Sequence, residues 1–343
     1  NQGPAASQLA VTFSRMRVTV LGAGSWGTAL SILLARNGHV VGLWGRDADE
    51  IQAMVSLREN LHYMPGFVLP EGIEPLSSEL PELDCDMWVI AVPSGAVRTV
   101  CKMVRGANPL VVIASKGLES GTGKLMHEVV DEVLPGACSG ALSGPNLAVE
   151  IVRGIPTAAI ATFENDEAAD RVRTAFTCRT FRVYCSSDVI GVELAGALKN
   201  VLALASGMAD GLGFGDNSKG ALLARGLKEM MQLGKAMGAR PETFLGIAGV
   251  GDLFATAVSR LSRNYRVGRA LGEGKPLSQA LADVGQVAEG VTTCESALML
   301  GRRNQVQMPV FEVIEGVVRG RLNPLEGVSL LMERNTKEEG LWL

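Results

Sequence analysis

A short glycine-rich segment near the start of the chain most limits what the protein can fold into. Residues 18–21 form an apolar run typical of a buried strand, GAGSWG follows at 22–27, and a helical pattern comes next. A strand, a G-x-G-x-x-G turn and a helix in this order are typical of a dinucleotide-binding βαβ unit. Gly22 would permit the tight turn, Gly24 would let a pyrophosphate approach the backbone, and Gly27 would let helix and strand pack. The segment predicts a dinucleotide cofactor with its phosphates at the helix N-terminus.

Strand and helix patterns alternate over the first half of the chain, and only helical patterns follow. Strand-like runs occur at 40–44, 87–92, 110–115, 139–142, 156–162 and 181–185, with a helical pattern at 124–133. This alternation predicts a doubly wound parallel sheet. From residue 189 on, helical patterns cover 189–209, 219–237, 276–284, 294–301 and 309–318. We expect an α/β plus α protein: a Rossmann-type dinucleotide-binding domain over 16–189 and an all-helical substrate-binding domain over 190–343.

Composition excludes several other classes of protein. Lys and Arg total 32 against 36 Asp and Glu, a net charge of −4, which argues against a nucleic-acid partner. Six cysteines without a C-x-x-C pair indicate free thiols in a reducing compartment. The three histidines lie far apart in sequence, so we expect neither a histidine-based metal site nor a Ser-His-Asp triad.

The ends of the chain and its glycines carry further expectations. Residues 1–15 have no periodic pattern, so we interpret them as a leader or disordered tail; the remnant of a transit peptide is the alternative. No integral membrane segment is expected, and we place the protein in the cytoplasm, with the plastid stroma as alternative. The chain has 41 glycines in 343 residues, a share of about 12% against an average of about 7%. Beyond those near ligands, we expect many of them at turns and helix ends.

Lys199 is the most informative single residue. It lies in the middle of the helical pattern 189–209, which is apolar almost all round and should be buried. Its helical neighbours, three and four residues away, are small or apolar and offer no charged partner. A buried ammonium tends to have a lowered pKa. Lys199 is therefore a candidate general acid and base, or an anchor for an anionic ligand.

Other polar residues follow the ends of predicted strands or interrupt apolar helices. Lys116 directly follows the run 110–115, at the carboxyl end where ligands bind in such sheets. The sequence SGPN at 143–146 occupies the equivalent place after a later strand. In the helical half, GVGD at 249–252 and SRN at 262–264 are polar clusters, and the last of these offers an arginine and an amide suited to a phosphate.

The end of the second strand bears on the choice of cofactor. Arg46 falls where a guanidinium could contact the 2′-phosphate of NADP, whereas an exposed loop arginine is the other interpretation. Asp47 keeps NAD open, because an acidic residue there can bind the ribose hydroxyls. The sequence predicts NAD or NADP without deciding between them.

Taken together, these segments are recognisable. The chain resembles the NAD(P)-dependent glycerol-3-phosphate dehydrogenases, and the bacterial or plastid type more closely than the animal type. The order of the Lys-Asn helix and the SRN loop is specific to that family. The matching segments are GAGSWGTAL at 22–30, SKGLE at 115–119, SGPNLAVE at 143–150, GVELAGALKNVLA at 191–203, GVGDL at 249–253, SRN at 262–264 and QVAEG at 286–290.

The resemblance implies a reaction: reversible reduction of dihydroxyacetone phosphate to sn-glycerol 3-phosphate, a precursor of glycerophospholipids. It implies that Lys199 exchanges the proton on the substrate oxygen, that Asp252 supports it and that Lys116 contacts substrate and cofactor. Substrate binding is implied for Gly144, Asn146, Asn200, Thr256, Ser262, Arg263 and Asn264. Cofactor binding is implied for Gly22, Gly24, Ser25, Trp26, Gly27, Arg46, Lys116, Ala148, Arg263, Val287 and Glu289. A homodimer is compatible with it.

Two departures and two alternatives accompany the resemblance. Ala255 stands where the family commonly has a threonine, and Asn146 where some members have one, which affects fine substrate geometry. One alternative is a related two-domain dehydrogenase of hydroxyacids, which would need no phosphate anchor at Arg263 and Asn264. The other is a non-catalytic nucleotide sensor, which would need none of Lys116, Lys199 and Asp252.

Overall fold

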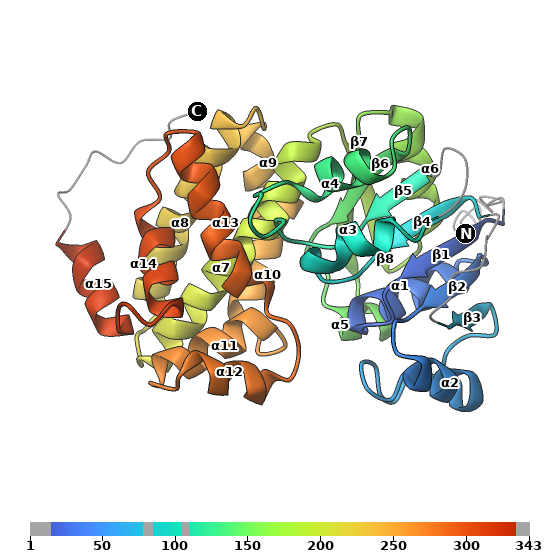
Figure 1. The fold of residues 1–343 in the computed structure, drawn as a ribbon, viewed down its shortest axis with the longest axis horizontal. Helices are drawn as coiled ribbons and strands as arrows, with labels where there is room; N and C mark the ends of the chain where they lie inside the picture. Colours follow the sequence, from blue (N-terminus) through green and yellow to red (C-terminus); the bar gives the residue numbers. More distant parts are fainter. Residues whose placement is uncertain (1–14, 78–84, 105–109, 334–343) are drawn as a thin grey trace, which may run out of the picture.

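The computed structural model describes residues 15–77, 85–104 and 110–333. Apart from Arg15, the expected leader lies outside the described residues. Figure 1 shows a part with a β-sheet on the right, formed by the first half of the chain, and a helical part on the left. The change from one to the other comes at α7 (Val189–Gly211), after the last strand.

The described strands form one eight-stranded sheet in the order β3-β2-β1-β4-β5-β6-β7-β8. All neighbouring pairs are parallel except β6 and β7. The predicted doubly wound sheet is therefore confirmed, whereas its fully parallel character was wrong at this one pair. The sequence patterns also missed β3, a short strand that contains Pro75. The strands are β1 (Arg17–Leu21), β2 (Val40–Trp44), β3 (Ile73–Leu76), β4 (Met87–Ile90), β5 (Leu110–Ile113), β6 (Cys138–Ser143), β7 (Thr157–Phe163) and β8 (Phe181–Ser186).

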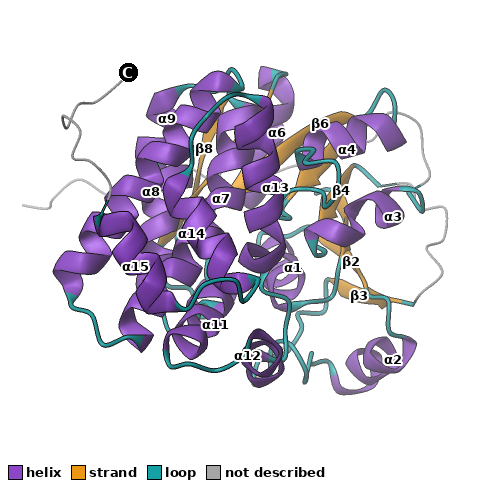
Figure 2. Ribbon diagram, turned by 60° about the vertical axis from the view of Figure 1, so that its left-hand side comes forward, coloured by secondary structure: helices purple, strands orange, loops and turns teal. Residues whose placement is uncertain are grey.

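Helices cover both faces of the sheet (Figure 2). On one face α1, α5 and α6 pack on the apolar side chains of the strands, and on the other α3 and α4 do so. Strands covered on both sides must be apolar throughout, which is why the runs were visible in the sequence. The helices here are α1 (Ser25–Arg36), α2 (Ala48–Leu57), α3 (Val97–Cys101), α4 (Met126–Val133), α5 (Ala148–Val152) and α6 (Asp166–Phe176), with a 3-10 turn η1 (Ser94–Ala96).

The helical part is built around α7. This helix packs against α8, α10, α11, α13 and α14, and residues 191–209 are all buried. It is long and apolar enough to cross a membrane, but 94% of its apolar stretch is buried inside the protein. The other elements are α8 (Asp216–Ala236), α9 (Pro241–Leu245), a π-helical turn η2 (Ile247–Gly251), α10 (Asp252–Val258), α11 (Arg263–Gly272), α12 (Leu277–Val284), α13 (Glu289–Arg303), α14 (Pro309–Val318) and α15 (Pro324–Met332).

The turn between β1 and α1 needs glycine at two of its three motif positions. Gly22 has a φ of +122°, and a Cβ there would lie 2.7 Å from the carbonyl oxygen of Ala91. A Cβ on Gly27 would collide with the carbonyl oxygen of Gly22. These are the tight turn and the close helix–strand packing that the motif predicts. Gly24, by contrast, has no heavy atom within 4 Å of its Cβ position.

Glycines inside helices bring α7 and α11 into backbone contact. A Cβ on Gly207 of α7 would collide with the carbonyl oxygen of Tyr265, and one on Gly268 of α11 with that of Leu204. Many of the remaining glycines do lie at turns and helix ends, among them Gly38, Gly238 and Gly285, whereas these two lie inside helices. Without side chains between them, the two helix axes can approach more closely than the usual 8–10 Å for packed helices.

We predict that Gly268→Ala lowers the free energy of unfolding by about 1–3 kcal/mol, the usual effect of overpacking a close contact. Gly220→Ala is the matched control, because Gly220 is also helical but its Cβ position is open. That change should stabilise the protein by about 0.5–1 kcal/mol through helix propensity. Denaturant unfolding of both variants checks this, and equal effects would contradict the close contact.

Candidate active site

Asp252 joins two lysines from distant parts of the chain. It is the first residue of α10, directly after the π-helical turn η2, and it is 1% exposed. Its Oδ1 accepts a hydrogen bond from Lys199 Nζ of α7 at 2.9 Å, and its Oδ2 accepts one from Lys116 Nζ at 2.7 Å. Lys116 follows β5 at the carboxyl edge of the sheet. One carboxylate therefore links the sheet to the helical part and sets two ammonium groups side by side.

Each lysine has a second partner. Lys116 donates to the carbonyl oxygen of Gly144 at 2.8 Å, and Lys199 to Thr256 Oγ1 at 2.6 Å. The helical neighbours of Lys199 offer no charged partner, as the sequence indicated; its partner Asp252 comes from another helix, in agreement with the support that the resemblance implies. Since an ammonium carries three donors, each lysine retains one N–H for a ligand.

Burial and charge set the titration of this cluster. Burial lowers the pKa of Lys199 to about 8; Asp252 opposes the shift, and the cations of Lys116 and Arg263 add to it. Burial disfavours ionised Asp252, but the two lysines outweigh it and lower the pKa of this carboxyl. The lowered pKa predicted for Lys199 is confirmed in direction. With two cations sharing one anion, the cluster is suited to an anionic ligand.

A second cluster of polar residues surrounds the N-terminus of α11. Asn264 Nδ2 donates to Asn200 Oδ1 at 2.9 Å, and its own Oδ1 accepts the backbone N–H of Gly290 at 2.9 Å. Ser262 caps the helix by accepting the N–H of Tyr265. Arg263 remains open to solvent, but surrounding protein lowers its pKa through desolvation, which Glu289 opposes. Its guanidinium has a recessed position that a ligand can still reach.

The glycine turn has the features of a phosphate site. No side chain caps the N-terminus of α1, and the open Cβ position of Gly24 leaves the backbone accessible. Free N–H groups at a helix N-terminus attract phosphate. The side chains around the turn are fixed: Ser25 Oγ donates to the carbonyl of Tyr63 at 2.8 Å, and Trp26 Nε1 to that of Ala114 at 3.0 Å. These residues fit a dinucleotide.

The other predicted cofactor residues are distributed around this edge. Arg46 is exposed and makes no hydrogen bond or ion pair with the described part of the chain. Asp47 caps α2, accepting the N–H groups of Asp49 and Glu50, so its carboxylate already has a structural use. Ala148 begins α5, Val287 is 48% exposed, and Glu289 begins α13.

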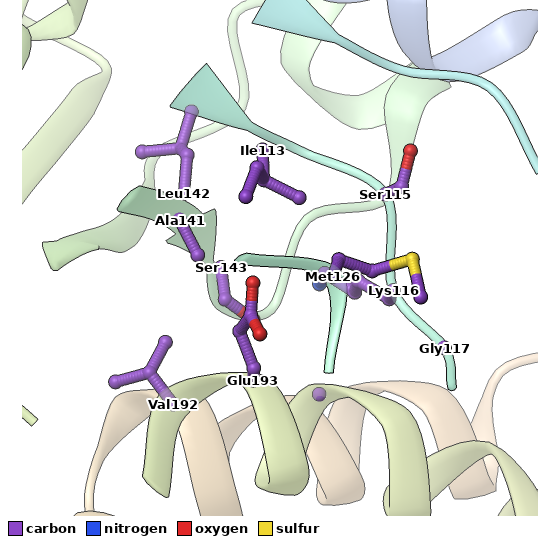
Figure 3. A pocket seen from close by; sticks show the side chains of 11 residues that line it. Ile113, Ser115, Lys116, Gly117, Met126, Ala141, Leu142, Ser143, Val192 and Glu193 are labelled. Carbon is purple, nitrogen blue, oxygen red and sulfur yellow. The ribbon is translucent and has the colours of Figure 1, made fainter. Parts of the chain in front are cut away.

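A small pocket lies between the carboxyl edge of the sheet and α7 (Figure 3). Lys116, Ser143, Glu193 and Gly196 are among the residues that line it. Ser143 Oγ is buried without a hydrogen-bond partner in the described structure. Asn146, nearby in the same loop, uses its Nδ2 to bind the carbonyl of Ala158, while its buried Oδ1 has no such partner.

Sequence reasoning missed three residues near these groups. Ser94, after β4, binds Glu289 through both its backbone N–H, at 3.0 Å, and its hydroxyl. Its place beyond a predicted strand end was a usable signal. The backbone carbonyl of Tyr63 accepts a hydrogen bond from Ser25, and Tyr63 lies close enough to Arg263 to influence the pKa of its guanidinium. Glu193 is a buried acid of α7, and no spacing in the sequence pointed to it.

Comparison with known proteins agrees with this geometry. Models of the N-terminal and C-terminal parts of NAD-dependent glycerol-3-phosphate dehydrogenase match residues 17–169 and 188–329. The chain belongs to this family. It is accordingly an oxidoreductase with a Rossmann-type part that binds a nicotinamide dinucleotide. The family match also favours this class over the hydroxyacid dehydrogenases.

Individual relatives cover nearly the whole chain. A glycerol-3-phosphate dehydrogenase [NAD(P)+] of Desulfitobacterium hafniense is 45% identical over 326 residues, 94% of this chain and 93% of that one. One from a Thermoanaerobacter species is 46% identical over 94% and 99% of the two chains. The crystal structure of glycerol-3-phosphate dehydrogenase from Coxiella burnetii has a TM-score of 0.90 at 35% identity, covering 93% and 99%.

We predict that Asp252→Asn lowers the free energy of unfolding by about 3–5 kcal/mol, because it leaves the buried ammonium of Lys199 and the half-buried one of Lys116 without their shared anion. Asp283→Asn is the control, since Asp283 pairs with Lys275 at the surface and its loss should change stability little. Denaturant unfolding of the two variants measures the difference. Similar small effects would show that the bridge does not stabilise the fold.

Proposed function

We propose that the enzyme catalyses reversible reduction of dihydroxyacetone phosphate at C2 to sn-glycerol 3-phosphate, with NADH or NADPH. The observation that carries this is the pair of lysines bridged by Asp252, one with a pKa of about 8, at the carboxyl edge of the sheet. A donor with a pKa near neutral pH serves both directions of proton transfer. The recessed Arg263 beside this pair suits the substrate phosphate.

The lysines perform the proton chemistry. The bound cofactor supplies or accepts the hydride. As the carbonyl is reduced, negative charge grows on its oxygen, and the cations of Lys116 and Lys199 stabilise it. Lys199 donates its proton to that oxygen, and in the reverse direction its neutral amine takes the proton from the hydroxyl. Asp252 and Thr256 hold the amine in place through their hydrogen bonds.

The remaining candidate residues hold the two small molecules. Arg263 and Asn264 bind the substrate phosphate, supported by Asn200 and by Ser262, whose hydroxyl caps α11. Gly144 and Asn146 form the substrate loop, and Asn146 offers a buried oxygen that needs a donor. The residues that would hold the cofactor are Gly22, Gly24, Ser25, Trp26, Gly27, Arg46, Lys116, Ala148, Arg263, Val287 and Glu289.

The cellular role follows from the product. sn-Glycerol 3-phosphate is the backbone of glycerophospholipids, so we assign the enzyme to supplying this precursor. As separate proposals, we place the enzyme in the cytoplasm and assign it the form of a homodimer. The dinucleotide domain, up to residue 189, and the helical domain, from 190, meet at the reacting groups.

Oxidation of NAD(P)H with dihydroxyacetone phosphate, beside several 2- and 3-keto acids, tests the substrate. Turnover of a keto acid alone would overturn this function.

We predict that Lys199→Ala lowers kcat at least about 100-fold, since general acid catalysis contributes about 10²–10⁴-fold. Cofactor affinity should hardly change, because Lys199 does not line the glycine turn. In the wild-type enzyme, reduction should decline as the pH rises through about 8, where the ammonium is lost, and oxidation should increase. Steady-state kinetics against pH checks both. Near-normal turnover of the variant would remove Lys199 from the chemistry.

We predict that Arg46→Ala reduces kcat/KM for NADPH more than for NADH, by about tenfold, since loss of a charged hydrogen bond to the 2′-phosphate is worth about 1.5–3 kcal/mol. The control is Arg179→Ala, which removes another exposed arginine. Kinetics with both cofactors measures the ratio. An unchanged ratio for Arg46→Ala would show that Arg46 does not contact the 2′-phosphate.

A further inference from the structure

Buried Glu193 and half-buried His127 form a contact that the proposed reaction does not use. Glu193 lies on α7, six residues before Lys199, and is 7% exposed. Its Oε1 accepts the backbone N–H of His127 at 3.1 Å, and its Oε2 lies 2.8 Å from His127 Nδ1. His127 is in the first turn of α4. The contact therefore ties the helix that carries Lys199 to a helix that packs on the sheet.

The segment that leads into α4 carries Lys116. Residues 114–125 connect β5 to α4, and they leave the sheet to reach the helical part. Leu118 and Leu125 are each buried in the same apolar core as α7. The contact of Glu193 with His127 comes directly after this segment and fixes its far end. Its near end is fixed by β5.

Packing does not hold Lys116 on every side. Its side chain borders the small pocket of Figure 3, together with Ser143, Glu193 and Gly196. Figure 3 shows Glu193 rising from α7 toward the strand ends. A Cβ on Gly196 would lie 3.7 Å from the Lys116 stem, so α7 passes close to the lysine where it carries no side chain. Hydrogen bonds to Gly144 and Asp252 hold the ammonium end of Lys116, whereas the position of its backbone depends on how the segment is held.

We propose that Glu193 and His127 are positioning residues, which hold segment 114–125 on α7 and so set Lys116 against Asp252 and Lys199. The proposal rests on the proposed function, in which Lys116 stabilises charge on the reacting oxygen. A displacement of about 1 Å in such a group can reduce the rate about 100-fold. The contact thus acts on the reaction through Lys116 and touches neither substrate nor cofactor.

The charges around His127 favour an ion pair. Burial opposes protonation of the ring, but Glu193 from α7 and Glu128 and Asp131 from α4 outweigh it and raise the pKa of His127. Below that pKa the contact is a charged pair; as the pH rises through it, the ring loses its charge while Glu193 still accepts the backbone N–H. A positioning role therefore predicts an inflection in kcat that depends on His127.

The test compares three variants in the full-length enzyme. Glu193→Gln removes the charge, His127→Asn removes the ring, and Glu229→Gln is the matched control. Glu229 is also a buried glutamate that accepts first-turn N–H groups of a helix, those of Val310 and Phe311 in α14. It lies outside the candidate site. Measurements are kcat and KM with dihydroxyacetone phosphate, their pH profiles, and the thermal midpoint.

We expect Glu193→Gln and His127→Asn to lower kcat at least about tenfold and to remove the His127 inflection, while the one near pH 8 from Lys199 persists. Glu229→Gln should lower the thermal midpoint without changing kcat. If all three variants lose stability but keep kcat, the contact is structural only and the proposal is overturned. If Glu193→Gln does not fold, His127→Asn decides. Failure of the wild-type enzyme to reduce dihydroxyacetone phosphate would instead overturn the function itself.

Discussion

The carboxylate of Asp252 is the interaction on which the candidate active site depends. It lies between two ammonium groups that the chain order separates by more than 80 residues, and it is buried together with Lys199, whereas Lys116 is half-buried. Two lysines would repel each other in an apolar setting. The single anion makes their proximity tolerable, while burial, together with the cation of Lys116, lowers the pKa of Lys199 to about 8. Through its hydrogen bond to Lys116, Asp252 also joins the edge of the sheet to the helical part. The same carboxylate therefore stabilises the fold and arranges the two candidate catalytic lysines.

Helix α7 makes this arrangement possible. It runs through the helical part and presents Lys199 and Asn200 next to one another, one toward Asp252 and the other toward Asn264. Its glycine contact with α11 brings the two helices close enough for that amide pair. The proposed proton donor and the proposed phosphate anchor are therefore placed by one helix and its packing.

Much of the fold could be predicted from local patterns. The glycine turn at 22–27 has a fixed stereochemical requirement, and short apolar runs of four to seven residues differ in length from the long apolar helix at 189–211. β3 escaped notice because it is a four-residue edge strand, where pairing comes from its neighbour and not from its own sequence. The reversed direction of β7 also had no signal, since an apolar run does not reveal which way it is paired.

The sequence by itself determined the dinucleotide turn, the change from a sheet to helices at α7, and the choice of Lys116 and Lys199 as candidate site residues. These depend on the backbone freedom of glycine, on hydrophobic period and on a cation set in an apolar helix. Only the tertiary structure decided that Asp252 is shared by both lysines and that Glu193 meets His127. Such pairings join side chains far apart in the chain, and their geometry exists only once the helices have packed against the sheet.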